Sequence, residues 1–255
     1  MARLTVLGTG SGGNCFYVGS NGRGILVDAG FRAKEIEARM RSLDLEPRAV
    51  DGIFLTHEHG DHVRGAANFA TRHALPVHST RATYRSVPSL RRRKVRFQAI
   101  EPGQAFTTGP FTVTPFSIPH DAQDPVGYLV DVDGVRIGIT TDLGHVTPVV
   151  RTAWCTADVL VVESNHDIDM LRLGPYPASL KERVLSLRGH LSNDALAGFF
   201  AERLLRPLNR VVLAHLSKVN NHPNLALATA RRALGGAAVH LSVAAQDEPT
   251  PIVEL

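Results

Sequence analysis

The segment FLTHEHGDH, residues 54–62, is the feature that most constrains how this chain can fold. Three histidines and two acidic residues fill six positions directly after an apolar run with the composition of a strand. On a helix, His57 and His59 would point about 200° apart, whereas in an extended turn after a strand their imidazoles can converge. A glycine then lets the turn direct Asp61 and His62 toward a second point nearby. The spacing therefore favours two metal ions over one.

Further candidate ligands stand where other apolar runs end. Two metal ions need about seven or eight protein ligands, so several must come from elsewhere in the chain. His120 follows FTVTPFSI, Asp142 follows VRIGIT, and His215 closes RVVLAH. In α/β proteins the ends of strands form the edge at which sites are built. For any one of these residues a capping or surface role is the simpler interpretation, but three together with the cluster make coincidence a poor explanation.

Short strand-like runs dominate both halves of the chain and end mostly in polar or ionisable residues. They cover residues 3–8, 24–28, 52–56, 111–118, 126–132, 135–140, 158–163 and 210–215. Asp133-Gly134 between two of these runs predicts a hairpin, because this pair tolerates the positive φ of a type I′ turn. Strands that alternate with helices, plus an antiparallel hairpin, indicate an α/β fold with mixed sheets.

Helical periodicity follows several of the strands. One helix is expected where Ile36, Met40 and Leu43 share a face, and another over residues 224–234. A third is predicted to begin at a cap in residues 192–194. Its apolar face holds Leu196, Phe199, Phe200 and Leu204.

The glycine-rich segment GTGSGG, residues 8–13, fits the G-x-G-x-x-G pattern of dinucleotide-binding proteins. That pattern requires a helix to open at its end, whereas the following NCFYVG has the composition of a strand. We therefore predict a turn between two strands and no nicotinamide site.

The overall composition sets broad limits on the class of protein. A chain of 255 residues can bury one large core, and no linker divides it, so we expect one domain over residues 1–255. No run reaches the eighteen or so uncharged apolar residues that a membrane span needs, and we expect a soluble, cytoplasmic protein with no membrane partner. Cys15 and Cys155 belong to no CxxC pattern, which argues against disulfides and thiolate zinc sites.

Positive charge is concentrated in one part of the chain. Residues 63–100 carry nine Lys and Arg side chains, including Arg91, Arg92 and Arg93, and no Asp or Glu, although the net charge of the whole chain is only +4. Two interpretations stay open. The run is either a solvated face that keeps the protein soluble, or a track that neutralises nucleic-acid phosphates.

The order of the candidate ligands resembles the motifs of the metallo-β-lactamase superfamily. The matching residues are His57-x-His59-x-Asp61-His62, His120, Asp142 and His215, preceded by Asp28 in LVDAG. Further segments are similar to the bacterial WalJ/YycJ group of that superfamily: SGGNC, HDAQDPVGY, VVESNHD, LGPYPASLKERV, GHLSN and AHLSKVNNHP. The resemblance implies a four-layer αββα sandwich with two mixed sheets, a dinuclear site, and 5′ to 3′ exonuclease activity on double-stranded DNA.

The resemblance also implies a distribution of ligands. By motif position, the first metal takes His57, His59 and His120, the second takes Asp61, His62 and His215, and Asp142 bridges them. A bridging carboxylate is a feature of phosphodiesterase members, whereas the lactamases use a cysteine for the second metal, and TTDLG contains none. Histidine and carboxylate ligands suit Zn²⁺, Mn²⁺ and also Fe. Asp28 is expected to lie behind the metals and to fix the turn by hydrogen bonds.

The chemistry expected of such a site is hydrolysis by a hydroxide that the two metals activate. Asp61 is expected to orient that hydroxide while it remains a ligand. Glu163, at the end of DVLVVE, and His190, in GHLSN, resemble a Glu and His pair of tRNA-processing relatives. With a carboxylate partner, His190 would stay charged and act as general acid. The alternative is structural, with His190 before a helix cap and Glu163 bound to a backbone donor.

The substrate contacts are the least constrained part of the sequence. Lys218, Asn220 and Asn221 follow His215 directly and are candidates for contact with a phosphate. The three consecutive arginines at residues 91–93 are candidates for the track.

These residues are compatible with three functions. The favoured one is a metal-dependent phosphodiesterase acting on nucleic acid, with DNA favoured and RNA left open. Only 72 residues separate Asp142 from His215, too few for the inserted domain of the β-CASP ribonucleases. A hydrolase of small phosphodiesters or thioesters predicts turnover insensitive to salt, whereas a nuclease predicts rates that fall steeply with salt. A non-catalytic nucleic-acid-binding module is expected to lack a ligand, and here every one is present.

Overall fold

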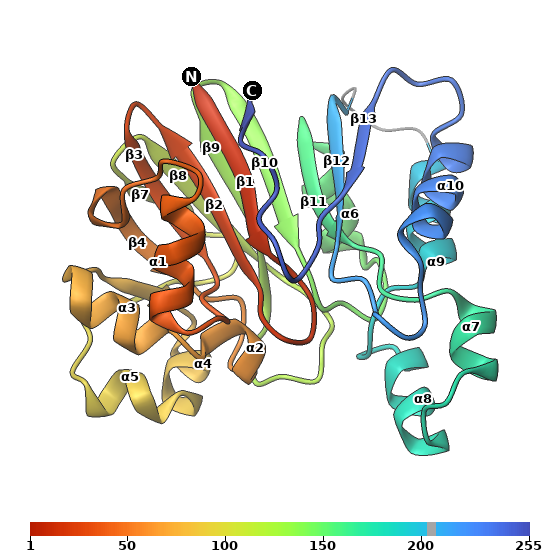
Figure 1. Ribbon diagram of the computed structural model, residues 1–255, viewed down its shortest axis with the longest axis horizontal. Coiled ribbons are helices and arrows are strands. Elements are labelled where there is room, and N and C mark those ends of the chain that lie inside the picture. Colours follow the sequence, from red (N-terminus) through yellow and green to blue (C-terminus); the bar gives the residue numbers. More distant parts are fainter. Residues whose placement is uncertain (203–207) are drawn as a thin grey trace.

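The central strands are apolar on both faces, which requires a layer of protein on each side of a sheet. In β11 (Val159–Glu163), Val159 and Val161 pack against the opposite sheet. Leu160 and Val162 point the other way and pack beneath helices. The computed structural model describes residues 1–202 and 208–255, and its two sheets lie face to face with helices outside each of them (Figure 1).

The first sheet contains seven strands in the order β14-β1-β2-β3-β4-β5-β6. These are β1 (Ala2–Gly8), β2 (Cys15–Ser20), β3 (Arg23–Val27), β4 (Val50–Phe54), β5 (Val77–Ser79), β6 (Phe97–Ala99) and β14 (Val253–Glu254). The strands from β14 to β3 pair antiparallel, and those from β3 to β6 pair parallel. The pairing of β14 with β1 brings the two termini together (Figure 1).

The second sheet has the order β13-β12-β11-β10-β9-β8-β7. Besides β11 it contains β7 (Phe106–Thr108), β8 (Phe111–Ser117), β9 (Val126–Val132), β10 (Val135–Thr140), β12 (Arg210–Ala214) and β13 (His240–Val243). The strands from β7 to β10 pair antiparallel, and those from β10 to β13 pair parallel. Each sheet therefore has one antiparallel and one parallel part, which confirms the predicted sandwich of two mixed sheets.

The helices form the two outer layers. Those on the first sheet's side are α1 (Ala33–Arg41), α2 (Gly60–Val63), α3 (Ala66–His73), α4 (Arg81–Ser86) and α5 (Pro88–Arg92), with a 3₁₀ turn at Pro47–Ala49. Those on the second sheet's side are α6 (Pro148–Cys155), α7 (Ile168–Leu173), α8 (Ala178–Leu185), α9 (Asn193–Phe200) and α10 (Pro223–Leu234). Figure 1 shows α2, α4, α5 and α8 along the same lower edge of the molecule.

Several local predictions are confirmed. A strand, β2, follows the glycine-rich segment, so that segment is a turn between strands. Asp133 and Gly134 have φ values of 50° and 79°, as the predicted hairpin turn requires. Ser192 caps α9 by accepting a hydrogen bond from the backbone N–H of Ala195. Leu204 lies outside the described residues, and Leu43 follows the end of α1.

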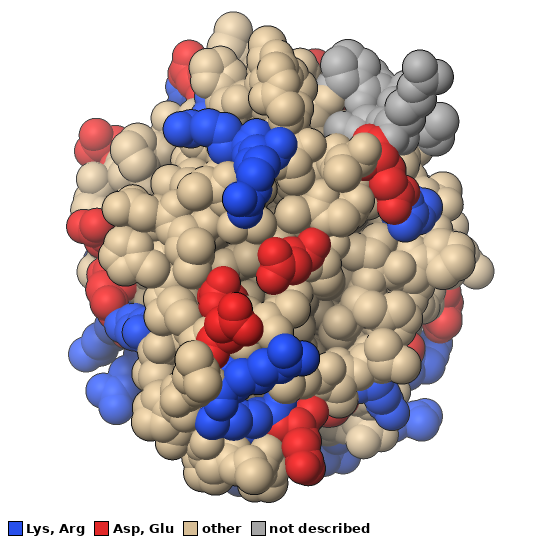
Figure 2. All heavy atoms as spheres, turned by 90° about the vertical axis from the view of Figure 1, so that its right-hand side faces the viewer, with Lys and Arg blue, Asp and Glu red and all other residues tan. Residues whose placement is uncertain are grey.

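The face formed by the second sheet's helices carries charges of both signs. On the side of α7–α10, positive and negative side chains are interspersed (Figure 2). No helix within the described ranges is long and apolar enough to cross a lipid bilayer.

Candidate metal centre

The candidate site lies where strands of both sheets end. Asp28 follows β3, Asp142 lies just beyond β10, and His215 follows β12. These three residues have left-handed backbone conformations, with φ values of 59°, 57° and 53°. Non-glycine residues adopt this conformation rarely, and it tends to occur at functional sites, where the surrounding structure holds it in place. The chain therefore bends sharply at each strand end and turns these side chains inward.

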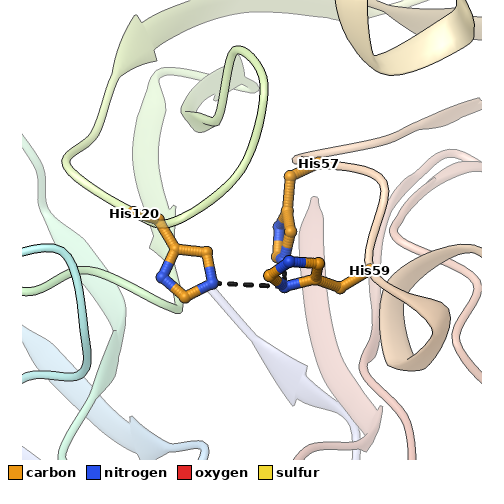
Figure 3. Close-up of side chains that lie close together, drawn as sticks. All are labelled: His57, His59 and His120. Carbon is orange, nitrogen blue, oxygen red and sulfur yellow. Dashed lines mark hydrogen bonds between the residues drawn. The ribbon is translucent and has the colours of Figure 1, made fainter. Parts of the chain in front are cut away.

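Three histidines from two separate loops form the first group of possible ligands. Nε2 of His57 lies 3.0 Å from Nδ1 of His59, which lies 3.3 Å from Nε2 of His120 (Figure 3). Nitrogens that bind one tetrahedral zinc ion lie about 3.4 Å apart. Burial lowers the pKa of His57 well below its ordinary value, and burial also lowers that of His120. Neutral imidazoles have the free lone pair that a metal ligand needs, so this group fits a cation.

Asp142 lies at the centre of a second group. One of its oxygens is 2.5 Å from Nε2 of His62 and 3.8 Å from Nε2 of His57. The other oxygen is 2.7 Å from Nδ1 of His215 and 3.2 Å from Nδ1 of His190. Despite these short distances, neither oxygen of this buried carboxylate has a partner in hydrogen-bond geometry among the described residues. A buried carboxylate whose two oxygens are close to imidazole nitrogens but not aligned for hydrogen bonds fits a ligand that a divalent cation would share with those histidines.

Asp61, His62 and His215 face one another beside Asp142. An oxygen of Asp61 lies 3.5 Å from Nε2 of His62 and 3.9 Å from Nε2 of His215. The latter nitrogen is buried without a hydrogen-bond partner in the described chain. The groups compact enough to hold an ion are His57 with His59 and His120, His57 with His62 and Asp142, and Asp142 with Glu163, His190 and His215. Asp61 is set slightly apart from all three.

Asp28 anchors the HEHGDH turn from behind. Its carboxylate is fully buried and accepts hydrogen bonds from the backbone N–H and the hydroxyl of Thr56, each at 2.8 Å. It also lies 2.7 Å from Nδ1 of His62. Burial raises the pKa of Asp28 despite these contacts. The bond to Nδ1 orients the His62 ring so that its Nε2 faces Asp142.

Asn14 ties the glycine-rich turn to the site, a role that the sequence reasoning missed. Its buried amide accepts hydrogen bonds from the Thr9 hydroxyl and the Gly10 N–H, and its nitrogen lies 3.0 Å from Nε2 of His62. The Asn14 N–H donates to the carbonyl of Asp61. Its position in SGGNC after the glycines was the only signal in the sequence.

Glu163 connects three loops of the second sheet. It is fully buried and accepts hydrogen bonds from the backbone N–H groups of Leu143 and Leu191. One of its oxygens lies 2.8 Å from Nδ1 of His190 and 2.8 Å from Nδ1 of His215. All of these contacts are internal, and they fix the rings of His190 and His215 relative to one another.

The histidines of the site differ in charge according to their carboxylate neighbours, with His57 and His120 shifted toward the neutral form and His62, His190 and His215 toward the protonated form. Burial opposes a charge on His215, but Asp142 and Glu163 outweigh it and raise the pKa to about 9. Against the same opposition from burial, Glu163 and Asp142 raise the pKa of His190 well above its ordinary value, and Asp142 and Asp28 do the same for His62. The pKa of Glu163 falls to about 2, because His190 and His215 outweigh its burial. A metal ligand must be unprotonated, so binding at His62 and His215 has to release protons.

The predicted substrate contacts are placed very differently. Lys218 is exposed and forms an ion pair of 2.7 Å with Asp247. Asn220 is buried, and neither polar atom of its amide has a hydrogen-bond partner in the described ranges. The amide of Asn221 is buried and bonded to Asn193 and to the carbonyls of residues 164 and 165, so the prediction that it contacts a phosphate needs correction. Its hydrogen-bonding capacity is used in holding α9 and the β12–α10 loop together.

The arginines at residues 91–93 are exposed at and just beyond the end of α5. Arg92 and Arg93 line a surface cavity of about 330 Å³ together with Arg64 and Asn68. Arg64 also donates a hydrogen bond to the carbonyl of Gly12, beside the glycine-rich turn. This cavity is therefore linked to the candidate metal centre through that turn.

Fold and site together match known proteins. A profile of the β-lactamase superfamily domain matches residues 23–215, and the chain belongs to this superfamily. It is 36% identical over 228 residues to exodeoxyribonuclease YycJ of Bacillus anthracis, covering 88% of this chain and 85% of that protein. It is 31% identical over 263 aligned positions to exodeoxyribonuclease WalJ of Streptococcus pneumoniae, covering 99% and 98%. The resemblance to the WalJ/YycJ group is thereby confirmed.

A solved structure supports the same conclusion on the fold. The metallo-β-lactamase fold protein YhfI from Bacillus subtilis superposes with a TM-score of 0.75 at 19% identity, covering 98% of this chain and 99% of that one. Family, fold and the clustered histidines and carboxylates define a metal-dependent hydrolase.

Proposed function

We propose that the protein is a nuclease that hydrolyses phosphodiester bonds from the 5′ end of double-stranded DNA. The observation that carries the proposal is the group around Asp142, a buried carboxylate between two sets of histidines with both oxygens free of aligned hydrogen bonds. The relatives named exodeoxyribonucleases support DNA as the substrate.

Two divalent ions fit the arrangement. His57, His59 and His120 would hold one, Asp61, His62 and His215 the other, and Asp142 would lie between them. Zn²⁺, Mn²⁺ and Fe all suit such ligands. The chemistry that bound ions supply here is a water of lowered pKa and neutralisation of charge on the phosphoryl oxygens.

His190 supplies the proton that the leaving group needs. Its Nδ1 faces Glu163 at 2.8 Å, and its side chain is 20% exposed, so its other nitrogen is free for substrate. The raised pKa of His190 keeps the ring protonated at neutral pH. A protonated imidazole held in this way can donate to the alkoxide that departs from phosphorus. Asp61, whose pKa is lowered, orients an attacking water through its carboxylate.

The unpaired positive charge on α4 and α5 suits a polyanion. Seven exposed side chains between residues 81 and 96 form no ion pair with any described residue: Arg81, Arg85, Arg91, Arg92, Arg93, Lys94 and Arg96. By contrast, Arg23, Arg151 and Arg183 each pair with an acidic side chain. Charge without an internal partner is available to neutralise phosphates.

Degradation of end-labelled nucleic acid tests the proposal. Wild-type protein with Mn²⁺ or Zn²⁺ is expected to release nucleotides from the 5′ end of duplex DNA, faster than from single-stranded DNA or RNA. Asp61→Ala/His62→Ala is expected to be inactive, whereas the exposed pair Asp44→Ala/His240→Ala keeps wild-type activity. Equal activity in wild type and Asp61→Ala/His62→Ala would sink the assigned site. Turnover of small phosphodiesters that ignores salt would replace the nuclease by a small-molecule hydrolase.

Two further points from the sequence stay proposals. One is that residues 1–255 form a single domain without a β-CASP insertion. The other is that the protein works in the cytoplasm. Proteolysis of the native protein and fractionation of cells test them in turn.

A further inference from the structure

Two exposed leucines stand beside the candidate metal centre. Among the described residues six large hydrophobic side chains are exposed, and Leu185 and Leu187, at 43% and 70%, are the two that lie within a few positions of His190. Single exposed leucines are ordinary on a protein surface. Two at alternate positions, both outside the core, form a small apolar projection at the edge of a polar site.

The backbone that carries these leucines is held firmly. The carbonyl of Leu187 lies 3.0 Å from Nδ1 of His145. The N–H of Gly189 donates to Ser186, and the N–H of His190 donates to Val184. A Cβ at Gly189 would lie 2.2 Å from the carbonyl of Arg183, so only glycine fits this packing. The leucine side chains are therefore displayed from a fixed support and not from a loose loop.

This support is joined directly to the loops of the site. Nε of Arg188 donates to the carbonyl of His120 at 3.0 Å, and the Gly189 carbonyl lies 3.2 Å from Nδ1 of the same histidine. On its other side, a Cβ at Gly144 would lie 2.2 Å from the carbonyl of Leu187. Leu187 thus lies between the loop that carries His120 and the loop that follows Asp142. Figure 1 shows α8, which ends at Leu185, projecting beyond the edge on which α2 lies.

The charge around the two leucines indicates which kind of ligand they would contact. Arg188 follows Leu187 directly, and the described part of the chain gives it bonds to carbonyls only, with no acidic partner. Arg183, on the other side of the leucines, is ion-paired with Asp121. Exposed apolar atoms beside an unpaired cation match the end of a nucleic-acid duplex, where stacked bases lie next to the phosphate backbone. A lipid surface or a second copy of the chain would not need the adjoining metal centre.

We propose that Leu185 and Leu187 form a wedge that stacks against the terminal base pair of a DNA duplex and separates its strands. The inference rests on the proposed nuclease function. It adds the step that duplex substrate requires, because one strand must leave its partner before its phosphate can reach ligands that are mostly buried. Apolar side chains that enter a base step unstack it in this way.

Fluorescence of a terminal 2-aminopurine tests the wedge without turnover. Metal-stripped wild-type protein in EDTA is expected to raise the fluorescence of 2-aminopurine in the last pair of a blunt duplex. Leu185→Ser/Leu187→Ser is expected to bind the same duplex and leave the fluorescence unchanged. Leu173→Ser, at an equally apolar and 87% exposed position at the end of α7, serves as the matched control and should behave as wild type. Binding without a fluorescence rise in wild type would overturn the wedge, whatever the activity.

Degradation of two duplexes separates the wedge from the nuclease proposal. On a blunt duplex, kcat/KM of the double variant is expected to fall on the order of tenfold or more, because opening the end is then unassisted. On the same duplex with five unpaired nucleotides at the end, it should match wild type within about twofold. Equal losses on both substrates would reject the wedge, and so would a change of oligomeric state in the double variant. Loss of all cleavage in wild type, with the fluorescence rise intact, would reject the nuclease alone.

Discussion

Asp28 and Glu163 are both fully buried carboxylates behind the candidate metal centre, one at each sheet, yet they organise very different amounts of chain. The contacts of Asp28 go to Thr56 and His62, within a single turn. Those of Glu163 go to residues 143, 190, 191 and 215, on three separate loops. The contacts of Asp28 therefore all lie on one short segment, which we call the local half of the centre. Those of Glu163, the distant half, form only after three loops of the second sheet have come together.

The pKa values of the two carboxylates also differ, because the carboxylates have different numbers of histidine neighbours. Burial raises the pKa of Asp28, which has one histidine beside it. Glu163 is as buried, but two histidines lie against it and lower its pKa to about 2. The number of cationic partners, and not burial alone, decides which way a buried carboxylate shifts.

The largest expected effect comes from Glu163→Gln. The amide would bring a donor toward backbone N–H groups and remove the charge that keeps His190 protonated. We expect kcat to fall on the order of 10²- to 10⁴-fold and the free energy of unfolding to fall by roughly 2–4 kcal/mol. Single-turnover kinetics and urea unfolding measure both. Glu182→Gln, an exposed change on α8, is the control, and a Glu163→Gln protein with full kcat would contradict the account.

Asp28→Asn should act on one half of the centre only. Without the carboxylate, His62 loses the contact that orients its ring, so affinity for the second metal is expected to fall about 10- to 100-fold. The first metal, held by His57, His59 and His120, should bind as before. Calorimetric titration of the stripped protein with Zn²⁺ distinguishes the two sites, and exposed Asp44→Asn is the control. Loss of both sites together would mean that the halves are not independent.

The basic surface of α5 should contribute through salt dependence. Arg92→Ala/Arg93→Ala is expected to lower the slope of log(kcat/KM) against log[salt] by about two, since each phosphate contact contributes roughly one. Arg231→Ala/Arg232→Ala removes the same charge from exposed positions on α10, where charges of both signs are interspersed (Figure 2), and should leave the slope unchanged. Equal slopes in both variants would show that only net charge matters.

A prediction outside the candidate metal centre, and without an expected effect on turnover, concerns a buried histidine that has no carboxylate beside it. His78 stacks on Phe54 at 4.3 Å, and burial lowers its pKa to about 4. The unfolded chain binds this proton near pH 6.5, so the stabilising contribution is present above pH 6.5 and is lost as the pH falls toward 4. Between these values wild type should lose up to roughly 3 kcal/mol more than His78→Phe. Urea unfolding at several pH values checks this, and parallel curves would contradict it.

The sequence predicted the local half of the centre better than the distant half. His57, His59, Asp61 and His62 are contiguous, so their spacing alone indicates convergence. His120, Asp142 and His215 were found only because each follows an apolar run. Strands that run in the same direction end at one edge of a sheet, and this brings residues that follow them close together. The family resemblance supplied the four-layer arrangement, which composition and periodicity do not specify.

Hydrogen bonds between side chains that are distant in the sequence could not be predicted. Asn221 seemed free because it follows His215, yet its amide is used by Asn193 and two carbonyls. Asn14 contacts His62 across 48 positions of sequence. The strands β5, β6, β7, β13 and β14 also escaped prediction, because runs of two to four residues show too little alternation.

Metal content of purified protein tests the central claim most directly. The account predicts two divalent ions per chain by mass spectrometry of the metal-loaded wild type. It predicts one in His59→Ala, which breaks the group with His57 and His120, and one in His62→Ala, which breaks the group with Asp142. A wild type that holds fewer than one ion, or single variants that keep two, would contradict the convergence of both sheets on a shared pair of cations.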